Sequence, residues 1–435
     1  MGRRQEQCQS LVGSPCDAWG ARTGRLSSII ALISTLFLAA IAGMQPIYLD
    51  HAATTPLLPE VAAAMDRTAR DVCGNPASQH AFGRAARRVV EDARERIGVL
   101  LGLEQSSIQA DRVVFTSGGT EANNWAVRIL GLADERSRVS SRLLVSAVEH
   151  PSVQGPADFC ARQGETVERI PVEPNGRIDP ARLAAMLAHP ARLVSVVLGN
   201  SETGILQPVP ELAALCRERG TLMHTDAVQA IGKIDVNFRE LGVAAMSVAA
   251  HKFHGPLGIG ALVLRSDVTP PPLLFGGFQQ EALRPGTESP ALVVGMCAAL
   301  EAWNRERQER TARLANLRDE LELRLRTAHP EFIAHGSGVP RLPQTLNIAL
   351  VGVDRQAMFL ALDQSRVACS TGSACASGSS EPSPTLRAMG CSDDVLASSL
   401  RFSVGGSTNA AEVCLAAERI LRVFQTLRHG AKAGK

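Results

Sequence analysis

Six short apolar runs, each followed by a polar or glycine-rich turn and separated by helical patterns, constrain the fold of this chain most strongly. They occupy residues 113–116, 143–148, 193–198, 222–225, 246–249 and 260–264. Continuous apolar strands that alternate with helices are typical of a mainly parallel sheet covered on both faces. We therefore predict an α/β fold whose ligand site lies at the carboxyl ends of the strands.

The length of 435 residues predicts two domains, because a single hydrophobic core rarely serves so long a chain. A long charged helix is expected near residues 301–326, where leucines recur at helical spacing. We assign residues 60–307 to a large domain, and residues 45–59 and 308–435 to a smaller α+β C-terminal domain. The Ser-, Gly- and Pro-rich residues 370–384 are predicted to form a mobile surface loop.

The composition argues against several classes of protein. Charged residues make up 20% of the chain and the formal net charge is +2, so no nucleic-acid or anionic-membrane partner is indicated. The 10 cysteines include no CxxC pair, which argues against both a structural zinc site and a disulfide scaffold. This composition is compatible with an enzyme that acts on a small molecule, although it does not argue for one. No metal site of its own is expected.

Residues 1–43 form an N-terminal extension whose composition differs from that of the rest of the chain. Arginines precede an apolar run at residues 29–43, which is too short for a confident transmembrane helix and is similar to the apolar region of a signal peptide. We interpret Met44 as the true start, with the extension lying upstream of the protein, and expect a cytoplasmic location. Anchoring or export through residues 26–43 is the alternative.

Polar residues follow the strands where a ligand is expected. Ser117 to Glu121 place glycines and a hydroxyl at a helix N-terminus, where free N–H groups and the helix dipole favour an anion. Alone, this pattern is a weak signal, because such a sequence is more often a turn with a helix N-cap. His150 follows the next run, and a lone histidine is as often structural as functional.

The next two strand ends supply an acid and a lysine. Asp226, with Gln229 one helical turn later, could pair with the protonated ring nitrogen of pyridoxal phosphate (PLP), or could simply cap a helix. Burying Lys252 after an apolar strand would cost free energy unless the lysine has a function. Formation of a Schiff base with a cofactor aldehyde is such a function, and an ordinary lysine at the entrance of a loop is the alternative. Four successive strand ends thus offer the anion cradle, histidine, acid and lysine that PLP requires.

From residue 46 to about residue 425 the chain resembles the cysteine desulfurases of the nitrogenase and iron–sulfur-cluster assembly type, which are fold-type I PLP-dependent transferases. The motifs that carry the resemblance are YLDHAATTP at 48–56, GNPAS at 74–78, TSGGTE at 116–121, EH at 149–150, HTDAVQ at 224–229, HK at 251–252, RPGT at 284–287, GSAC at 372–375 and RFS at 401–403.

The resemblance implies a set of cofactor contacts. Lys252 would bond to the cofactor aldehyde and move protons, Asp226 would bind the pyridine nitrogen, and His150 would stack on the ring. Gln229 and Ser201 would contact the ring hydroxyl. The remaining implied residues hold the phosphate: Gly119, Thr120, His251 and, from the neighbouring subunit of a homodimer, Thr287.

The resemblance also implies the substrate chemistry. Arg401, with Asn75, would clamp the carboxylate of L-cysteine. Cys375 would attack the substrate sulfur, giving L-alanine and a Cys375 persulfide, whereas Cys369 is interpreted as structural. The sulfur would pass to an acceptor such as an iron–sulfur scaffold protein, whose cluster Cys375 could contact transiently.

Two positions depart from the family pattern. Ser201 stands where relatives usually have an asparagine, so its contact with the ring hydroxyl is weakened. Ala249 replaces a frequent serine, which should weaken PLP binding by about 1.5–3 kcal/mol, the worth of a hydrogen bond to a charged group. An active enzyme is still expected, because Lys252 and Cys375 are present.

Three alternatives remain open on the sequence. A selenocysteine lyase could use the same pocket, and a related aminotransferase has the same fold but no use for Cys375. The third alternative is an inactive sulfur-relay scaffold, which the presence of Lys252, Asp226, His150 and Cys375 argues against.

Overall fold

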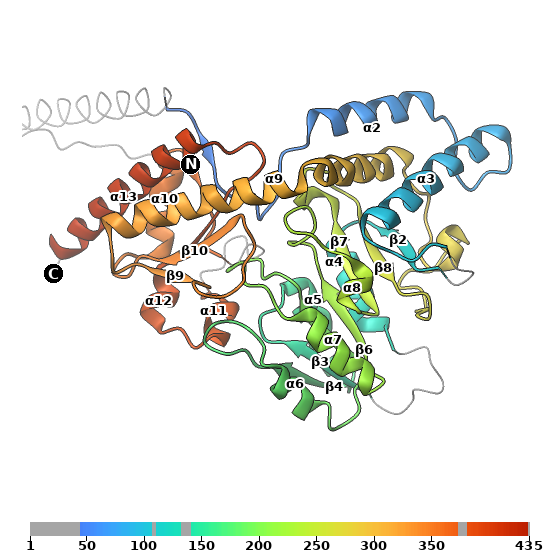
Figure 1. Cartoon of the computed structure of the whole chain (residues 1–435), viewed down its shortest axis with the longest axis horizontal. Helices are drawn as coiled ribbons and strands as arrows, with labels where there is room; N and C mark the ends of the chain where they lie inside the picture. Colours follow the sequence, from blue (N-terminus) through green and yellow to red (C-terminus); the bar gives the residue numbers. More distant parts are fainter. Residues whose placement is uncertain (1–43, 107–109, 132–140, 373–380, 434–435) are drawn as a thin grey trace, which may run out of the picture.

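The computed structural model describes residues 44–433 except 107–109, 132–140 and 373–380 (Figure 1). The predicted N-terminal extension and Cys375 therefore lie outside the described residues. The two largest hydrophobic cores of the described residues, of which the core beside the central sheet is the larger, organise the rest of the chain.

Within the described residues, seven strands form the central sheet in the order β2-β8-β7-β6-β5-β3-β4. Their bounds are Arg112–Thr116 (β2), Arg142–Ser146 (β3), Thr166–Ile170 (β4), Leu193–Val197 (β5), Leu222–Asp226 (β6), Ala245–Ala249 (β7) and Gly260–Leu264 (β8). All neighbours are parallel except those of β8, which runs antiparallel to both β2 and β7. The predicted, mainly parallel α/β fold is confirmed, and six of these strands coincide with the six apolar runs.

The strand β4 was not predicted from the sequence. Three of its five residues, Thr-Val-Glu-Arg-Ile, are polar and only Ile170 is buried, because β4 lies at the edge of the sheet and pairs only with β3. A half-exposed edge strand lacks the continuous apolar run that marks its buried neighbours.

Helices cover both faces of the sheet, and alternate strand residues point into the two layers. In β2, Val113 and Phe115 pack in the core that includes α3 and α7, whereas Val114 packs on the opposite side with Trp125 of α4. The helices up to this point are α2 (Pro59–Asp71), α3 (Ala81–Leu100), α4 (Gly119–Ile129), α5 (Pro151–Arg162), α6 (Pro180–Met186), α7 (Val209–Glu218) and α8 (Phe238–Leu241). Five of the described helices begin with a proline, a position where the missing N–H costs nothing: α2, α5, α6, α9 (Pro290–Ala328) and α11 (Pro384–Ala388).

A second core lies around a smaller antiparallel sheet of order β12-β10-β9. Its elements are β9 (Ile333–His335), β10 (Thr345–Ala349), α10 (Arg355–Gln364), β11 (Val367–Ala368), α11 (Pro384–Ala388), α12 (Asp393–Ser398), β12 (Ser399–Ser403) and α13 (Ala410–Ala433). The N-terminal strand β1 (Ile47–Tyr48) joins this part of the fold by pairing in parallel with β11.

The helix α9 (Pro290–Ala328) spans the two cores (Figure 1). Its first half contributes Val293 and Met296 to the large core, and its second half contributes Leu314 and Leu321 to the small one. The helix begins earlier than the sequence indicated, at Pro290, because Ser289 caps it by accepting a hydrogen bond from the N–H of Leu292.

None of the helices in the described ranges combines the length and the apolar character that crossing a membrane would require.

Several histidines are buried without a charge partner. His224 of β6 lies between the hydroxyls of Ser195 and Ser247, at 2.9 Å from each Oγ, and burial lowers its pKa to about 3. Burial lowers the pKa of His335 to about 4. The same cause dominates for three histidines near the ends of the strands, whose pKa values fall to about 3 or about 4: His51, His251 and His254.

We predict that acid destabilises the protein over the range in which these histidines titrate. A folded-state pKa below the unfolded value of about 6.5 contributes stability above pH 6.5 that is lost as the pH falls toward the folded pKa. Two buried carboxyl groups act in the opposite direction: Glu149, with a pKa that burial raises to about 8, and Glu202, whose pKa burial also raises. They are two groups against five. The free energy of unfolding by urea should fall by at least about 1.4 kcal/mol between pH 7 and pH 5, the worth of one pKa unit for one group. Equal stability at the two pH values would contradict this account.

Candidate active site

Lys252 lies just beyond the carboxyl end of β7, in the short helical turn Ala250–Lys252. Its Nζ donates to the backbone oxygens of Ala52 and Ala53, at 2.7 Å each. The Ala52 oxygen also accepts a hydrogen bond of 2.8 Å from Nε2 of Gln229. The segment after β1 therefore closes over the strand ends and supplies carbonyl oxygens to the lysine.

Asp226 is the last residue of β6 and is buried. One carboxylate oxygen accepts from Nδ2 of Asn123 at 2.7 Å, and the other accepts from the N–H of Val228 at 2.9 Å. Parallel pairing of β6 with β7 places Asp226 opposite Ser247, so the carboxylate and Lys252 share one edge of the sheet.

His150 caps the N-terminus of α5 and is connected to Asp226 through two side chains. Its Nδ1 accepts from the N–H of Ser152 at 3.1 Å, so in the neutral ring the proton is on Nε2. Asn123 Nδ2 donates to both Ser152 Oγ, at 2.8 Å, and Asp226. Burial lowers the pKa of His150; the charge of Asp226 opposes this shift, while Lys252 and Arg401 add to it.

The N-terminus of α4 is open. Among the residues that the structure describes, no side chain caps this end, and no heavy atom lies within 4 Å of the position that a Cβ on Gly118 would occupy. A Cβ on Gly119 would collide with Val228 at 2.8 Å, which explains the glycine at this point. Thr120, in the first turn, is exposed. Uncapped N–H groups beside open space suit a bound anion.

His251 completes this end of the site. Its Nδ1 lies 3.2 Å from Thr54 Oγ1, and a pKa of about 4 keeps the ring neutral. The donor set fits pyridoxal phosphate: Lys252 for the aldehyde, Asp226 for the ring nitrogen, and the α4 N-terminus for the phosphate.

A second lysine lies directly against the first. Lys233 is buried, and its Nζ donates to the backbone oxygen of Lys252. Burial, followed by the charges of Lys252 and Arg310, lowers the pKa of Lys233 to about 7.

Arg401 of β12 enters the same region from the small core, and its side chain is fully buried. Nη1 donates to the backbone oxygen of Ser201 and Nη2 donates to Asp50, each at 2.8 Å. The Nε atom has no hydrogen-bond partner among the described residues.

Two predicted residues lie elsewhere in this single chain. Asn75 is exposed in the loop between α2 and α3, and its side chain accepts from the N–H of Ala77. Thr287 is exposed in a segment that the Arg284–Glu121 ion pair, at 2.8 Å, ties to α4. No hydrogen bond within the described ranges joins either residue to Arg401 or Lys252.

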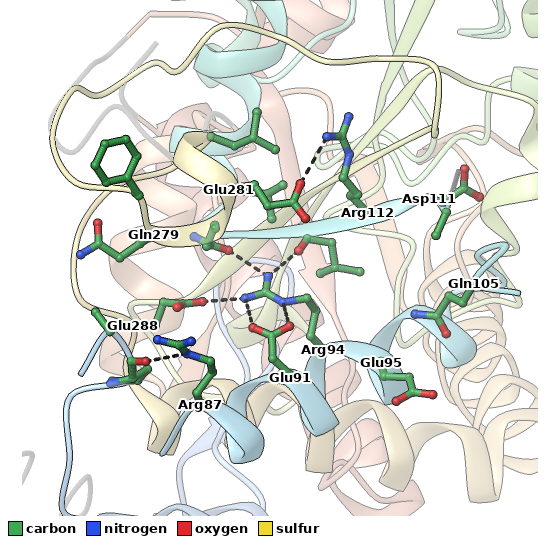
Figure 2. Close-up of a pocket in the computed structure, with 18 residues that line it drawn as sticks. Arg87, Glu91, Arg94, Glu95, Gln105, Asp111, Arg112, Gln279, Glu281 and Glu288 are labelled. Atoms are coloured by element: carbon green, nitrogen blue, oxygen red, sulfur yellow. Dashed lines mark hydrogen bonds and ion pairs between the residues drawn. The ribbon is translucent and has the colours of Figure 1, made fainter. Parts of the chain in front are cut away.

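The segment before Thr287 packs on the edge strand β2, beside the cavity drawn in Figure 2. Arg94 contacts the side chains of Glu91, Glu288 and Gln280 there (Figure 2). The cavity has a volume of about 940 Å³, and none of the predicted site residues lines it. It lacks the lysine and the uncapped helix end, so we place the active site at the strand ends instead.

Cys375 lies outside the described residues, but both ends of its segment are described. Before it, Ser370 exchanges backbone hydrogen bonds with Arg401, at 3.0 and 2.7 Å. After it, Ser383 Oγ donates to the buried carboxyl of Glu202 at 2.5 Å. The position of a Cβ on Gly372 lies 3.1 Å from the same Glu202 oxygen, so the two ends meet beside Arg401.

The sequence reasoning missed several residues that organise this site. They are Asp50, Asn123, Ser152, Glu202 and Lys233. Asp50, Glu202 and the neighbourhood of Asn123 belong to segments already singled out, but nothing in their spacing indicated which partner each side chain would contact.

Known proteins resemble the chain over most of its length. The sequence profile of the aminotransferase class-V family matches residues 47–415. Identity is 37% over 382 residues to a cysteine desulfurase IscS of Dictyoglomus turgidum, covering 88% of this chain and 95% of that protein. Identity is 40% over 383 residues to a cysteine desulfurase of Cereibacter sphaeroides, with the same two coverages. The solved structure of a NifS-like protein from Rickettsia africae matches with a TM-score of 0.79 at 28% identity, covering 88% of this chain and all of that one.

We predict that Asn123→Ala lowers the free energy of unfolding by about 1–3 kcal/mol, because Asp226 and Ser152 lose a buried donor. The neighbouring Asn124 is a matched control, since it bonds mainly within its own helix, to the oxygen of Thr120. Asn124→Ala should cost less than about 1 kcal/mol. Urea unfolding measures both changes, and an equal loss in the two variants would contradict the link between His150 and Asp226.

Proposed function

Because the chain belongs to the aminotransferase class-V family and is a PLP-dependent cysteine desulfurase, we propose that its cofactor binds at the carboxyl ends of β6 and β7. Lys252 bonds to the aldehyde and Asp226 pairs with the pyridine nitrogen. Gly119 and Thr120, at the open end of α4, and His251 hold the phosphate. The observation that carries this proposal is the meeting of Lys252, Asp226 and an uncapped helix N-terminus at one sheet edge.

When bound, pyridoxal phosphate supplies an electron sink for negative charge that develops at the substrate Cα. The chain contributes the proton transfers. Lys252 moves the proton at Cα, and His150, whose neutral ring carries its proton on Nε2, assists from the ring face. Gln229 offers an N–H to the ring hydroxyl, with Ser201 as a second, shorter donor.

Arg401 binds the carboxylate of L-cysteine, with Asn75 as a further contact. The guanidinium is buried and its Nε lacks a partner in the described part of the chain, which leaves a charged donor to be satisfied. Bidentate pairing of arginine with a carboxylate is strong and directional.

Cys375 acts as the nucleophile. Its thiolate attacks the substrate sulfur, a sulfur–sulfur bond forms and the carbon–sulfur bond breaks. The electron pair of the broken bond remains with Cβ, which takes up a proton to give L-alanine. The sulfur remains as a persulfide on Cys375. The described residues on either side of it support this role, because Ser370 bonds to the backbone of Arg401 and Ser383 Oγ donates to Glu202.

The proposal extends to the domains, the oligomeric state and the sulfur acceptor. Residues 60–307 form the cofactor domain, and residues 45–59 with 308–435 form the domain that carries the cysteine. The functional unit is a homodimer in which Thr287 reaches the phosphate of the neighbouring subunit; its exposure supports this role. The enzyme acts in the cytoplasm and passes sulfur to an acceptor such as an iron–sulfur scaffold protein.

We predict that Cys375→Ser reduces alanine and sulfide release from L-cysteine by at least about a hundredfold, because the hydroxyl cannot replace the nucleophilic thiolate. The assay contains a thiol reductant, and the colour of the bound cofactor should be retained.

Cys369 is the matched control. It is six residues away in the sequence, and burial raises the pKa of its thiol to about 12, which makes it a poor nucleophile. Cys369→Ala should therefore retain turnover. Full activity in Cys375→Ser would instead favour a lyase that eliminates sulfur directly.

A second prediction concerns Ala249. A Cβ on Gly119 would lie 3.4 Å from the Cβ of Ala249, so this residue faces the proposed phosphate cradle. Ala249→Ser would add a donor there, and we expect the dissociation constant of PLP to fall about tenfold or more, as for a hydrogen bond to a charged group. Titration of the apoprotein by absorbance measures the constant. An unchanged or larger value would place the phosphate elsewhere.

A further inference from the structure

The guanidinium of Arg401 is held at two of its three nitrogens. An arginine side chain carries five N–H donors in a planar fork. Nη1 donates to Ser201 and Nη2 to Asp50, each at 2.8 Å, while Nε has no partner within the described ranges. The hydrogen bonds of Nη1 and Nη2 therefore fix the plane of the guanidinium. Its remaining N–H groups are left for another acceptor.

Asp50 is itself fixed by the backbone. The preceding Leu49 donates its N–H to the oxygen of Ala368 at 3.0 Å, and Asp50 forms a bridge with Ser403, two residues after Arg401. The side chain of Asp50 is 20% exposed to solvent, whereas the side chain of Arg401 is fully buried. A carboxylate on a fixed strand next to a buried cation can control the orientation of that cation.

The contact also joins three parts of the molecule. Asp50 follows β1, Arg401 lies on β12, and Ser201 follows β5 of the central sheet. The other ionisable groups that feel the charge of Arg401 are Glu202, His150, Cys369 and Tyr48. In the part of the chain that the structure describes, Asp50 is the carboxylate that accepts a hydrogen bond from the guanidinium, so it is the anion that directs Arg401.

We propose that Asp50 is a positioning residue of the substrate site, which orients Arg401 so that the remaining N–H donors of the guanidinium donate to the carboxylate of L-cysteine. This inference rests on the proposed role of Arg401. The hydrogen bond from Nη2 performs the orienting, and the negative charge of Asp50 is not required for it. The Asp50–Arg401 pair is neutral overall, so the substrate enters as a second anion and meets some repulsion from Asp50.

The proposal separates two substitutions that remove the same charge. In Asp50→Asn the amide oxygen still accepts from Nη2, so binding of a carboxylate should equal or exceed that of the wild type. In Asp50→Ala the acceptor is lost, and binding should weaken at least about tenfold, because a charge-assisted contact depends on its geometry.

The probe is 3-mercaptopropionate, which has the thiol and the carboxylate of the substrate but no amine. Its dissociation constant is measured by calorimetry on the cofactor-loaded protein. The control ligand is 1-propanethiol, which has the thiol and the carbon chain of the probe but lacks the carboxylate, and its binding should be affected equally little by both substitutions. Wild-type affinity for 3-mercaptopropionate in Asp50→Ala, or equal weakening in both variants, would overturn the inference.

Arg401→Gln distinguishes this inference from the proposed function. If Arg401→Gln leaves the affinity for 3-mercaptopropionate unchanged, the carboxylate binds elsewhere and the assignment of Arg401 fails. If Arg401→Gln weakens binding but Asp50→Ala does not, Arg401 retains its role and only the inference on Asp50 fails.

Discussion

The parallel register of β6 and β7 places Asp226 opposite Ser247, five residues before Lys252. Because parallel strands end at the same edge of a sheet, this pairing brings a carboxylate and an amine together without any special contact between them. The α4 N-terminus reaches the same edge from the end of β2. A one-residue change of register would point Asp226 to the opposite face and separate the acid from the cofactor site.

The second requirement is that the small core closes on this edge. Pairing of β1 with β11 places the N-terminal segment beside the small sheet, and the same segment supplies Ala52 and Ala53 to Lys252. Arg401 reaches the loop after β5 from the opposite direction. The cofactor and substrate ends of the site therefore belong to different cores, and α9 fixes the relation between them by packing in both.

The electrostatic character of the site follows from burial more than from ion pairing. Three histidines whose rings feel the charge of Lys233 have lowered pKa values, mainly through burial, so His51, His251 and His254 remain neutral near neutral pH. Glu149 has a pKa that burial raises to about 8, and it accepts from Ser146 and from the N–H of Val197. Neutral groups of this kind leave Asp226, the lysines and the Arg401–Asp50 pair as the charges that a bound cofactor and substrate would meet.

The sequence by itself determined the six buried strands, the α/β class and the order of Gly119, His150, Asp226 and Lys252 along the strand ends, because apolar runs and parallel topology are local and periodic signals. It missed β4, whose exposed edge position removes that signal. Only the tertiary structure decided that Asp50 pairs with Arg401, 351 residues away, and that Asn123 and Ser152 connect His150 to Asp226. Contacts of this kind depend on how separate segments pack in space, and no periodicity along the chain records them.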